Sequence, residues 1–157
     1  MSKIVETPNT TVVAIVTNNY LLRLGLQKIV DDEKWIRLVG QAVHAGNLDE
    51  ILTNQHPHTV ILDTEIGCVA PDFIQKIKRV APRVKTILLS GFDDTECARQ
   101  ALDSGVDGIV LKVQPSAVLI ATIKYLANSG EEFVLPIGNG QASLQLCYAR
   151  AVPTATP

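Results

Sequence analysis

Residues 11–26 have the sequence TVVAIVTNNYLLRLGL, and this stretch joins an apolar run to a helical pattern. The run from Val12 to Val16 contains no polar residue, which predicts a β-strand that is buried on both faces. The apolar residues Leu22 and Leu26 are then spaced as on one face of a helix. Between the two patterns, Thr17 to Asn19 carry neither a carboxylate nor a glycine, although ligands of α/β proteins usually bind at the carboxyl ends of strands. The stretch therefore predicts a strand–helix unit with an uncharged binding edge.

The same alternation of strand and helix recurs five times along the chain. The predicted strands are Thr11–Val16, Ile36–Gln41, Thr59–Leu62, Lys85–Leu89 and Gly108–Leu111. Four of them are rich in Val, Ile and Leu without polar alternation, as in parallel strands covered on both faces, whereas the second alternates and is typical of an edge. Five strand–helix units predict an α/β fold, a doubly wound parallel sheet with right-handed crossovers. At this size we expect the flavodoxin-like strand order 2-1-3-4-5.

Local signals mark the ends of the helices. Asn47 is followed three residues later by Glu50, a capping box that predicts the start of the second helix at Asn47. Pro82 is expected to end the third helix. Asp93 or Asp94 is expected to cap the fourth helix, and Pro115 to lie in the first turn of the fifth.

The composition indicates one globular domain and excludes several classes of partner. The chain has 157 residues, of which 46% are hydrophobic and 19% charged, and a net charge of −2. Its basic residues are scattered, so we expect this chain itself to bind no nucleic acid. No apolar run approaches the roughly 20 residues that span a bilayer, so we expect no membrane partner. Three widely spaced cysteines, Cys68, Cys97 and Cys147, and the lack of a secretory signal indicate reduced thiols and a cytoplasmic location.

Polar residues of different chemistry fall at one edge of the predicted sheet. Thr17 and Asn18 follow the first strand, Asp63 the third, Ser90 the fourth and Lys112 the fifth. An aspartate can accept a phosphoryl group as a nucleophile, and an ammonium and a hydroxyl can bind the phosphoryl oxygens. The charge of an incoming phosphoryl group also needs a divalent cation, normally Mg²⁺, held by carboxylates.

Three motifs carry a resemblance to a known family. ILD ends at Asp63, LLSG contains Ser90 and SGVDGIVLK ends at Lys112, and together they resemble the receiver domain of bacterial response regulators, in particular the NarL/FixJ (LuxR-type) branch. The segment NNYLLRLGLQKIV is similar to the first-helix segment of that branch. The resemblance implies a phospho-acceptor position at Asp63 and phosphate-contact positions at Ser90 and Lys112.

The resemblance also divides the chain into three parts. We expect a flexible N-terminus over residues 1–10, a receiver-like domain over residues 11–130 and a C-terminal tail or linker over residues 131–157. In the LuxR-type branch a DNA-binding helix-turn-helix domain of about 60 residues follows the receiver, and the chain is expected to end before such a domain.

The sequence departs from the family pattern at the metal site. The acidic pair that should hold Mg²⁺ falls on Thr17 and Asn18, and neither is a carboxylate. Ile109 stands where the family has an aromatic switch residue. Glu65, two residues after Asp63, is a candidate auxiliary acid if it turns inward. We therefore expect Mg²⁺ to bind weakly if at all, and no other cofactor, with phosphorylation severely weakened.

These observations predict a degenerate receiver, or pseudo-receiver, that is not an enzyme. We expect a signalling and protein-interaction module in transcriptional regulation, with a sensor kinase or another regulator as partner, that forms a homodimer. One alternative is a conventional receiver that is phosphorylated on Asp63, and another is a small-molecule-binding regulatory module. In structural terms, Asp63 and Lys112 could form an ion pair that holds the fold together. Thr17 and Asn18 would then be ordinary strand-end and N-cap residues of the first helix.

Overall fold

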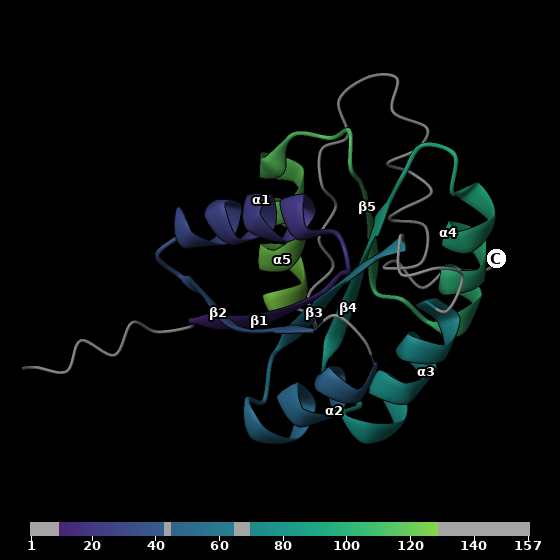
Figure 1. Cartoon of the computed structure of the whole chain (residues 1–157), viewed down its shortest axis with the longest axis horizontal. Helices are drawn as coiled ribbons and strands as arrows, with labels where there is room; N and C mark the ends of the chain where they lie inside the picture. Colours follow the sequence, from purple (N-terminus) through teal and green to yellow (C-terminus); the bar gives the residue numbers. More distant parts are fainter. Residues whose placement is uncertain (1–9, 43–44, 65–69, 129–157) are drawn as a thin grey trace, which may run out of the picture.

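Strands and helices alternate along the whole described part of the chain (Figure 1). The computed structural model describes residues 10–42, 45–64 and 70–128. In chain order the elements are β1 (Thr11–Val16), α1 (Tyr20–Asp31), β2 (Ile36–Ala42), α2 (Ala45–Asn54), β3 (Thr59–Asp63), α3 (Ala70–Val80), β4 (Lys85–Ser90), α4 (Thr95–Ser104), β5 (Gly108–Leu111) and α5 (Ser116–Ala127). None of the helices in these ranges has the length and hydropathy needed to cross a bilayer.

The five strands form one parallel sheet in the order β2-β1-β3-β4-β5. This confirms the predicted flavodoxin-like topology. Every residue of β1 and β3 is buried, as their uninterrupted apolar runs predict, whereas β2 lies at the edge and is largely half-exposed. Because all strands run the same way, their carboxyl ends meet at one edge of the sheet.

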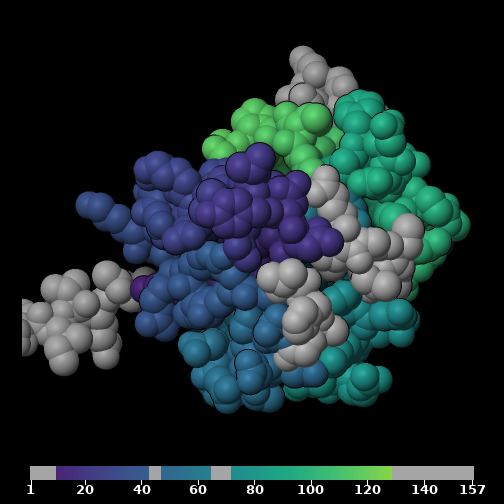
Figure 2. Space-filling view, viewed as in Figure 1, coloured from purple at the N-terminus to yellow at the C-terminus, as the bar shows by residue number. Residues whose placement is uncertain are grey.

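The helices cover the sheet in two layers (Figure 1). α1 and α5 pack on one face, where Leu26 and Val30 of α1 join Leu119 and Ile123 of α5 in a single core cluster. α2, α3 and α4 pack on the opposite face over a second core cluster. In the space-filling view α1 and α5 lie side by side at the surface (Figure 2). The sheet is thereby shielded on both sides, which leaves its edges as the places where polar groups gather.

Three strands are one residue longer than their sequence pattern predicts. β2 continues to Ala42, β3 to Asp63 and β4 to Ser90. Asp63 still pairs with Leu89, and Ser90 with Leu111, so the backbone ladder continues past the last apolar side chain. Asp63 and Ser90 are therefore held by the sheet itself rather than by the loops that follow it.

Several predicted helix ends differ from the observed ones. α2 begins at Ala45, so Asn47 lies in its first turn and is not its N-cap. The helical backbone of Ala45 and Gly46 starts the helix before the capping-box sequence is reached. Asp94 is the N-cap residue of α4, one of the two candidates, and Pro115 is the N-cap residue of α5 rather than part of its first turn. α3 ends at Val80, two residues before Pro82, as predicted.

Of the three cysteines, Cys97 is buried on α4 as a thiol rather than as part of a disulfide. Cys68 and Cys147 lie outside the described residues.

The C-terminus of α4 depends on a left-handed glycine. Gly105 has φ 96° and ψ 24°, and its N–H is bonded to carbonyls of the last turn. A Cβ at this position would meet only Lys78 Cε, at 3.8 Å, so a substitution is opposed by the backbone and not by crowding. We expect Gly105→Ala to lower the free energy of unfolding by about 1 kcal/mol, as measured by urea denaturation.

A matched variant separates this backbone effect from the general effect of adding a methyl group. Gly25 lies inside α1, and a Cβ placed on it would have no described neighbour within 4 Å. Gly25→Ala should raise the free energy of unfolding by up to about 1 kcal/mol, because alanine favours the helix. Equal effects of the two substitutions would contradict the assigned role of Gly105.

Candidate functional site

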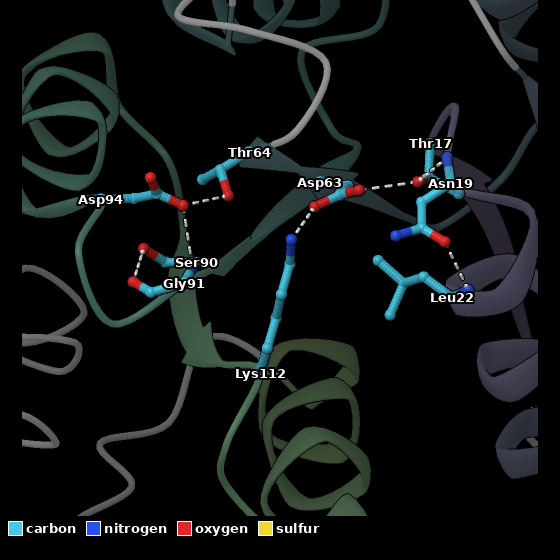
Figure 3. A network of polar contacts seen from close by, with 9 residues as sticks. All are labelled: Thr17, Asn19, Leu22, Asp63, Thr64, Ser90, Gly91, Asp94 and Lys112. Carbon is cyan, nitrogen blue, oxygen red and sulfur yellow. Dashed lines mark hydrogen bonds and ion pairs between the residues drawn. The ribbon is translucent and has the colours of Figure 1, made fainter.

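Four of the predicted site residues lie at the carboxyl edge of the sheet (Figure 3). Asp63 and Ser90 are the last residues of β3 and β4, Thr17 follows β1 and Lys112 follows β5. The register explains the position of Thr17, because Val16 pairs with Leu62 and the next residue on each strand is therefore level. The strand order thus brings together residues from four separate segments of the chain.

Two charged or polar groups contact the carboxylate of Asp63 from opposite sides (Figure 3). Lys112 Nζ lies 2.6 Å from Oδ1 of Asp63, and Thr17 Oγ1 donates a hydrogen bond of 2.7 Å to Oδ2. The Asp63 side chain is 1% exposed and that of Lys112 is 21% exposed. A carboxylate so deeply buried needs both a counter-charge and hydrogen-bond donors, and these two residues supply them.

Thr17 also connects the buried carboxylate to the start of α1. Its Oγ1 accepts a hydrogen bond of 3.0 Å from the backbone N–H of Asn19, and Asn19 Oδ1 accepts one of 3.0 Å from Leu22 N–H. Asn19, and not Asn18, is therefore the N-cap of the first helix, which corrects the prediction. Asn18 lies exposed between these two residues. Thr17 is a strand-end residue, as predicted, with an additional bond that the prediction missed.

Ser90 lies in the same edge, but its hydroxyl is turned to its own chain. Ser90 Oγ donates to the carbonyl oxygen of Gly91 at 3.1 Å, and its side chain is buried. Its role as a phosphate-contact position therefore stays a prediction.

A second polar network, which the sequence analysis did not identify, lies beside Ser90 (Figure 3). Asp94 Oδ2 accepts a hydrogen bond of 2.7 Å from Thr64 Oγ1 and one of 3.1 Å from Gly91 N–H. A Cβ on Gly91 would approach the same oxygen to 2.8 Å, so only glycine allows this contact without a shift. The carboxylate of Asp94 thus connects the end of β3 to the loop that follows β4, and does not cap its own helix through its side chain.

The remaining predicted site residues lie apart from this group or outside the described structure. Ile109 is buried on β5 in the core cluster under α3 and α4. Glu65 lies outside the described residues, so its proposed role as an auxiliary acid stays a prediction. In the described ranges no group of three or more His, Cys, Asp or Glu residues could hold a metal ion.

The sequence contained one signal for the contact between Thr17 and Asp63. In a 2-1-3-4-5 order β1 and β3 are neighbours, so the residues that follow their apolar runs are expected side by side. The Thr64–Asp94–Gly91 network had no such signal, because a polar residue near a helix start is more simply explained as a cap.

The chain belongs to the response regulator receiver domain family, whose model matches residues 13–124. Receiver domains of this family are signalling modules of two-component systems.

Relatives and solved structures agree with this assignment. The chain is 27% identical over 127 residues to the oxygen regulatory protein NreC of Staphylococcus epidermidis, which covers 78% of this chain and 56% of that protein. It is 32% identical over 88 residues to the transcriptional regulatory protein YesN of Bacillus subtilis, covering 55% of this chain and 24% of YesN. The chain thus spans about half the length of NreC and about a quarter of YesN.

The similar structures are also receiver domains or contain one. The isolated REC domain of RcsB from Salmonella enterica serovar Typhimurium has a TM-score of 0.69 and 24% identity, and the match covers 82% of this chain and 95% of that one. A LuxR family DNA-binding response regulator from Silicibacter pomeroyi has a TM-score of 0.60 and 27% identity, and the match covers 74% of this chain and 90% of that one. The RcsB likeness supports the fold alone, whereas the second structure also relates the chain to the LuxR-type branch.

Proposed function

We propose that this chain is a pseudo-receiver, a regulatory protein-interaction module of a transcription regulator that works without Mg²⁺-dependent phosphorylation of Asp63. One observation carries the proposal. At position 17, where the family resemblance expects a metal-binding carboxylate, a threonine hydroxyl donates to Asp63 Oδ2 at 2.7 Å. The oxygen that a cation would need is engaged by a neutral group of the chain itself.

Among the described residues, the groups around Asp63 do not fit a divalent cation. Mg²⁺ prefers several hard anionic oxygens in an octahedral arrangement. Two described groups in contact with Asp63 are instead a hydroxyl and the ammonium of Lys112, 2.6 Å away, which neutralises the carboxylate and repels a second cation. Positions 17 and 18 add no charge. We therefore expect Mg²⁺ to bind weakly, and no step of the function runs through it.

The family's switch position is also unsuited to report phosphorylation. It is taken by the buried aliphatic residue Ile109. An aliphatic side chain has no polar group that could form a hydrogen bond if the side chain moved to the surface. The site is consistent with one fixed arrangement that the ion pair and the Thr17 hydrogen bond stabilise.

A fixed site leaves protein contacts as the means of signalling. Tyr20, Leu21 and Leu24 are exposed apolar residues of α1, and such residues are common where proteins associate. We infer that α1 contributes to a homodimer or to the contact with a sensor kinase or another regulator in the cytoplasm. DNA binding would reside in another part of a longer regulator. A monomer in sedimentation velocity at micromolar concentration would exclude the homodimer.

The conventional alternative, a receiver that is phosphorylated on Asp63, keeps some support because Asp63, Ser90 and Lys112 are all retained. The two proposals differ in a direct experiment. After incubation with acetyl phosphate and Mg²⁺, we expect intact-protein mass spectrometry to detect no stoichiometric phosphoryl adduct. Beryllofluoride with Mg²⁺ should likewise leave the amide NMR resonances near Asp63 unshifted.

Asp63→Asn serves as the control in both measurements. A stoichiometric adduct in the natural chain that is lost in Asp63→Asn would overturn the pseudo-receiver and establish the conventional receiver. A low background that is equal in the two proteins supports the pseudo-receiver, since it does not depend on the acceptor position.

A further inference from the structure

A cavity of about 650 Å³ opens at the amino-terminal edge of the sheet, at the opposite edge from Asp63. The first residues of three strands, Thr11, Thr59 and Lys85, line it together with the last turn of α5. Its volume lies within the range of small-molecule sites, about 300–1,000 Å³. Because the strands are parallel, the cavity and the Asp63 site are separated by the length of the sheet.

The cavity collects positive charge that the described part of the chain does not neutralise. Arg83, Lys85 and Lys124 all line it, and none of the described lining residues is acidic. Among the described residues none of these three cations takes part in an ion pair. Unpaired cations around one concave surface attract an anion and raise its local concentration.

Two nearby groups contribute negative charge, but less than the positive charge of the three cations. The C-terminus of α5 adds about half a negative charge from its helix dipole, and the N–H of Asn128 already bonds to carbonyls of its last turn. The carboxylate of Glu33 accepts a hydrogen bond of 3.0 Å from Trp35 Nε1 and is not a lining residue. Three full positive charges exceed these contributions, so the cavity remains cationic.

The cavity also has apolar walls. Trp35, Pro57, Val84 and Leu126 supply apolar surface.

We propose that this cavity binds a small organic anion. The apolar part of the anion packs against the apolar wall that contains Trp35. The carboxylate or phosphate of the anion lies among Arg83, Lys85 and Lys124. An ammonium or guanidinium forms charge-assisted hydrogen bonds with either group. The apolar walls favour a compact organic molecule over a bare inorganic ion. This site is independent of the function proposed for Asp63.

The single tryptophan of the chain makes the proposal directly measurable, because Trp35 is part of the cavity wall. Three probes, added to the full chain, separate the contribution of the apolar ring from that of the negative charge. Cyclohexanecarboxylate has both the ring and the charge, cyclohexylmethanol has only the ring, and inorganic phosphate has only the charge. Amide and indole NMR shifts of Trp35, Thr59 and Val84 report the binding. We expect saturable shifts with cyclohexanecarboxylate and at least about fivefold weaker binding of the other two probes.

Charge-removing variants test which residues hold the anion. Arg83→Gln and Lys124→Gln should each weaken binding of cyclohexanecarboxylate about fivefold. Lys28→Gln removes the same charge from an exposed position on α1 outside the cavity, and should leave the affinity unchanged. All three residues are exposed, so the variants are expected to fold.

Three outcomes would overturn the proposal. The first is the absence of saturable shifts, which includes the case of a cavity filled by the chain's own ends. The second is equal binding of cyclohexanecarboxylate and cyclohexylmethanol, which would make the cations irrelevant. The third is a loss of affinity in Lys28→Gln as large as that in Arg83→Gln and Lys124→Gln, which would mean that binding depends only on the net charge of the protein.

Discussion

We expect Lys112→Met to lower the free energy of unfolding by about 2–3 kcal/mol. Removing one partner of a buried ion pair leaves the other charge uncompensated, which typically costs about 3–5 kcal/mol. Lys112 is 21% exposed, so water compensates part of the loss, and the Thr17 hydroxyl still donates to Asp63. Urea denaturation at neutral pH, followed by circular dichroism, measures the change.

The double variant Asp63→Asn/Lys112→Met tests the reason for this loss. Without the carboxylate no buried charge remains unpaired, so we expect most of the lost stability to return. A thermodynamic cycle over the two positions should therefore give a coupling energy of about 2 kcal/mol. The double variant also remains measurable if the single variant fails to fold.

An exposed ion pair provides the matched control. Lys28 and Asp32 lie 3.0 Å apart on α1 with side chains 77% and 62% exposed, and the same substitution, Lys28→Met, should leave the free energy of unfolding almost unchanged, because water and salt screen the pair. Similar losses at Lys112 and Lys28, or additive effects at Asp63 and Lys112, would contradict the view that the buried pair stabilises the fold.

The sheet could be predicted from the sequence because burial leaves a direct mark on strand composition. β1 and β3 are covered on both faces, and their uninterrupted apolar runs predicted both elements. The alternating pattern of β2 likewise predicted its place at the edge. The residues at the carboxyl ends, Asp63 and Lys112, then followed from the topology alone.

The contacts within the site could not be predicted in the same way. The topology places Thr17 beside Asp63, but the hydrogen bond between them depends on the exact register between β1 and β3, which is a tertiary property. Asn18 was expected as the helix cap, but α1 begins at Tyr20, so the observed cap is Asn19. The cavity beside Trp35 left no mark on the sequence, because its cations come from separate segments of the chain.

The family resemblance and the observed geometry together predict that a metal site can be restored. Thr17 Oγ1 lies 2.7 Å from Asp63 Oδ2, so an aspartate at position 17 brings a second carboxylate next to the first. Without a cation the two carboxylates repel each other, and a bound Mg²⁺ relieves this repulsion. We expect Thr17→Asp/Asn18→Asp to be destabilised by about 1–2 kcal/mol in EDTA and to recover in Mg²⁺.

The Mg²⁺ dependence of stability measures the restored site directly. A ligand that binds only the folded state stabilises it by about 2.7 kcal/mol at about 100 times its dissociation constant. We expect a gain of this size for the double variant in thermal or urea denaturation, and a change under about 0.5 kcal/mol for the natural chain. Thr17→Asn, which changes the shape at position 17 without adding a charge, should behave like the natural chain. The restored carboxylates should also allow acetyl phosphate to modify Asp63, since cation and acceptor then lie together. A Mg²⁺ response in the natural chain, or none in the double variant, would show that positions 17 and 18 do not decide metal binding.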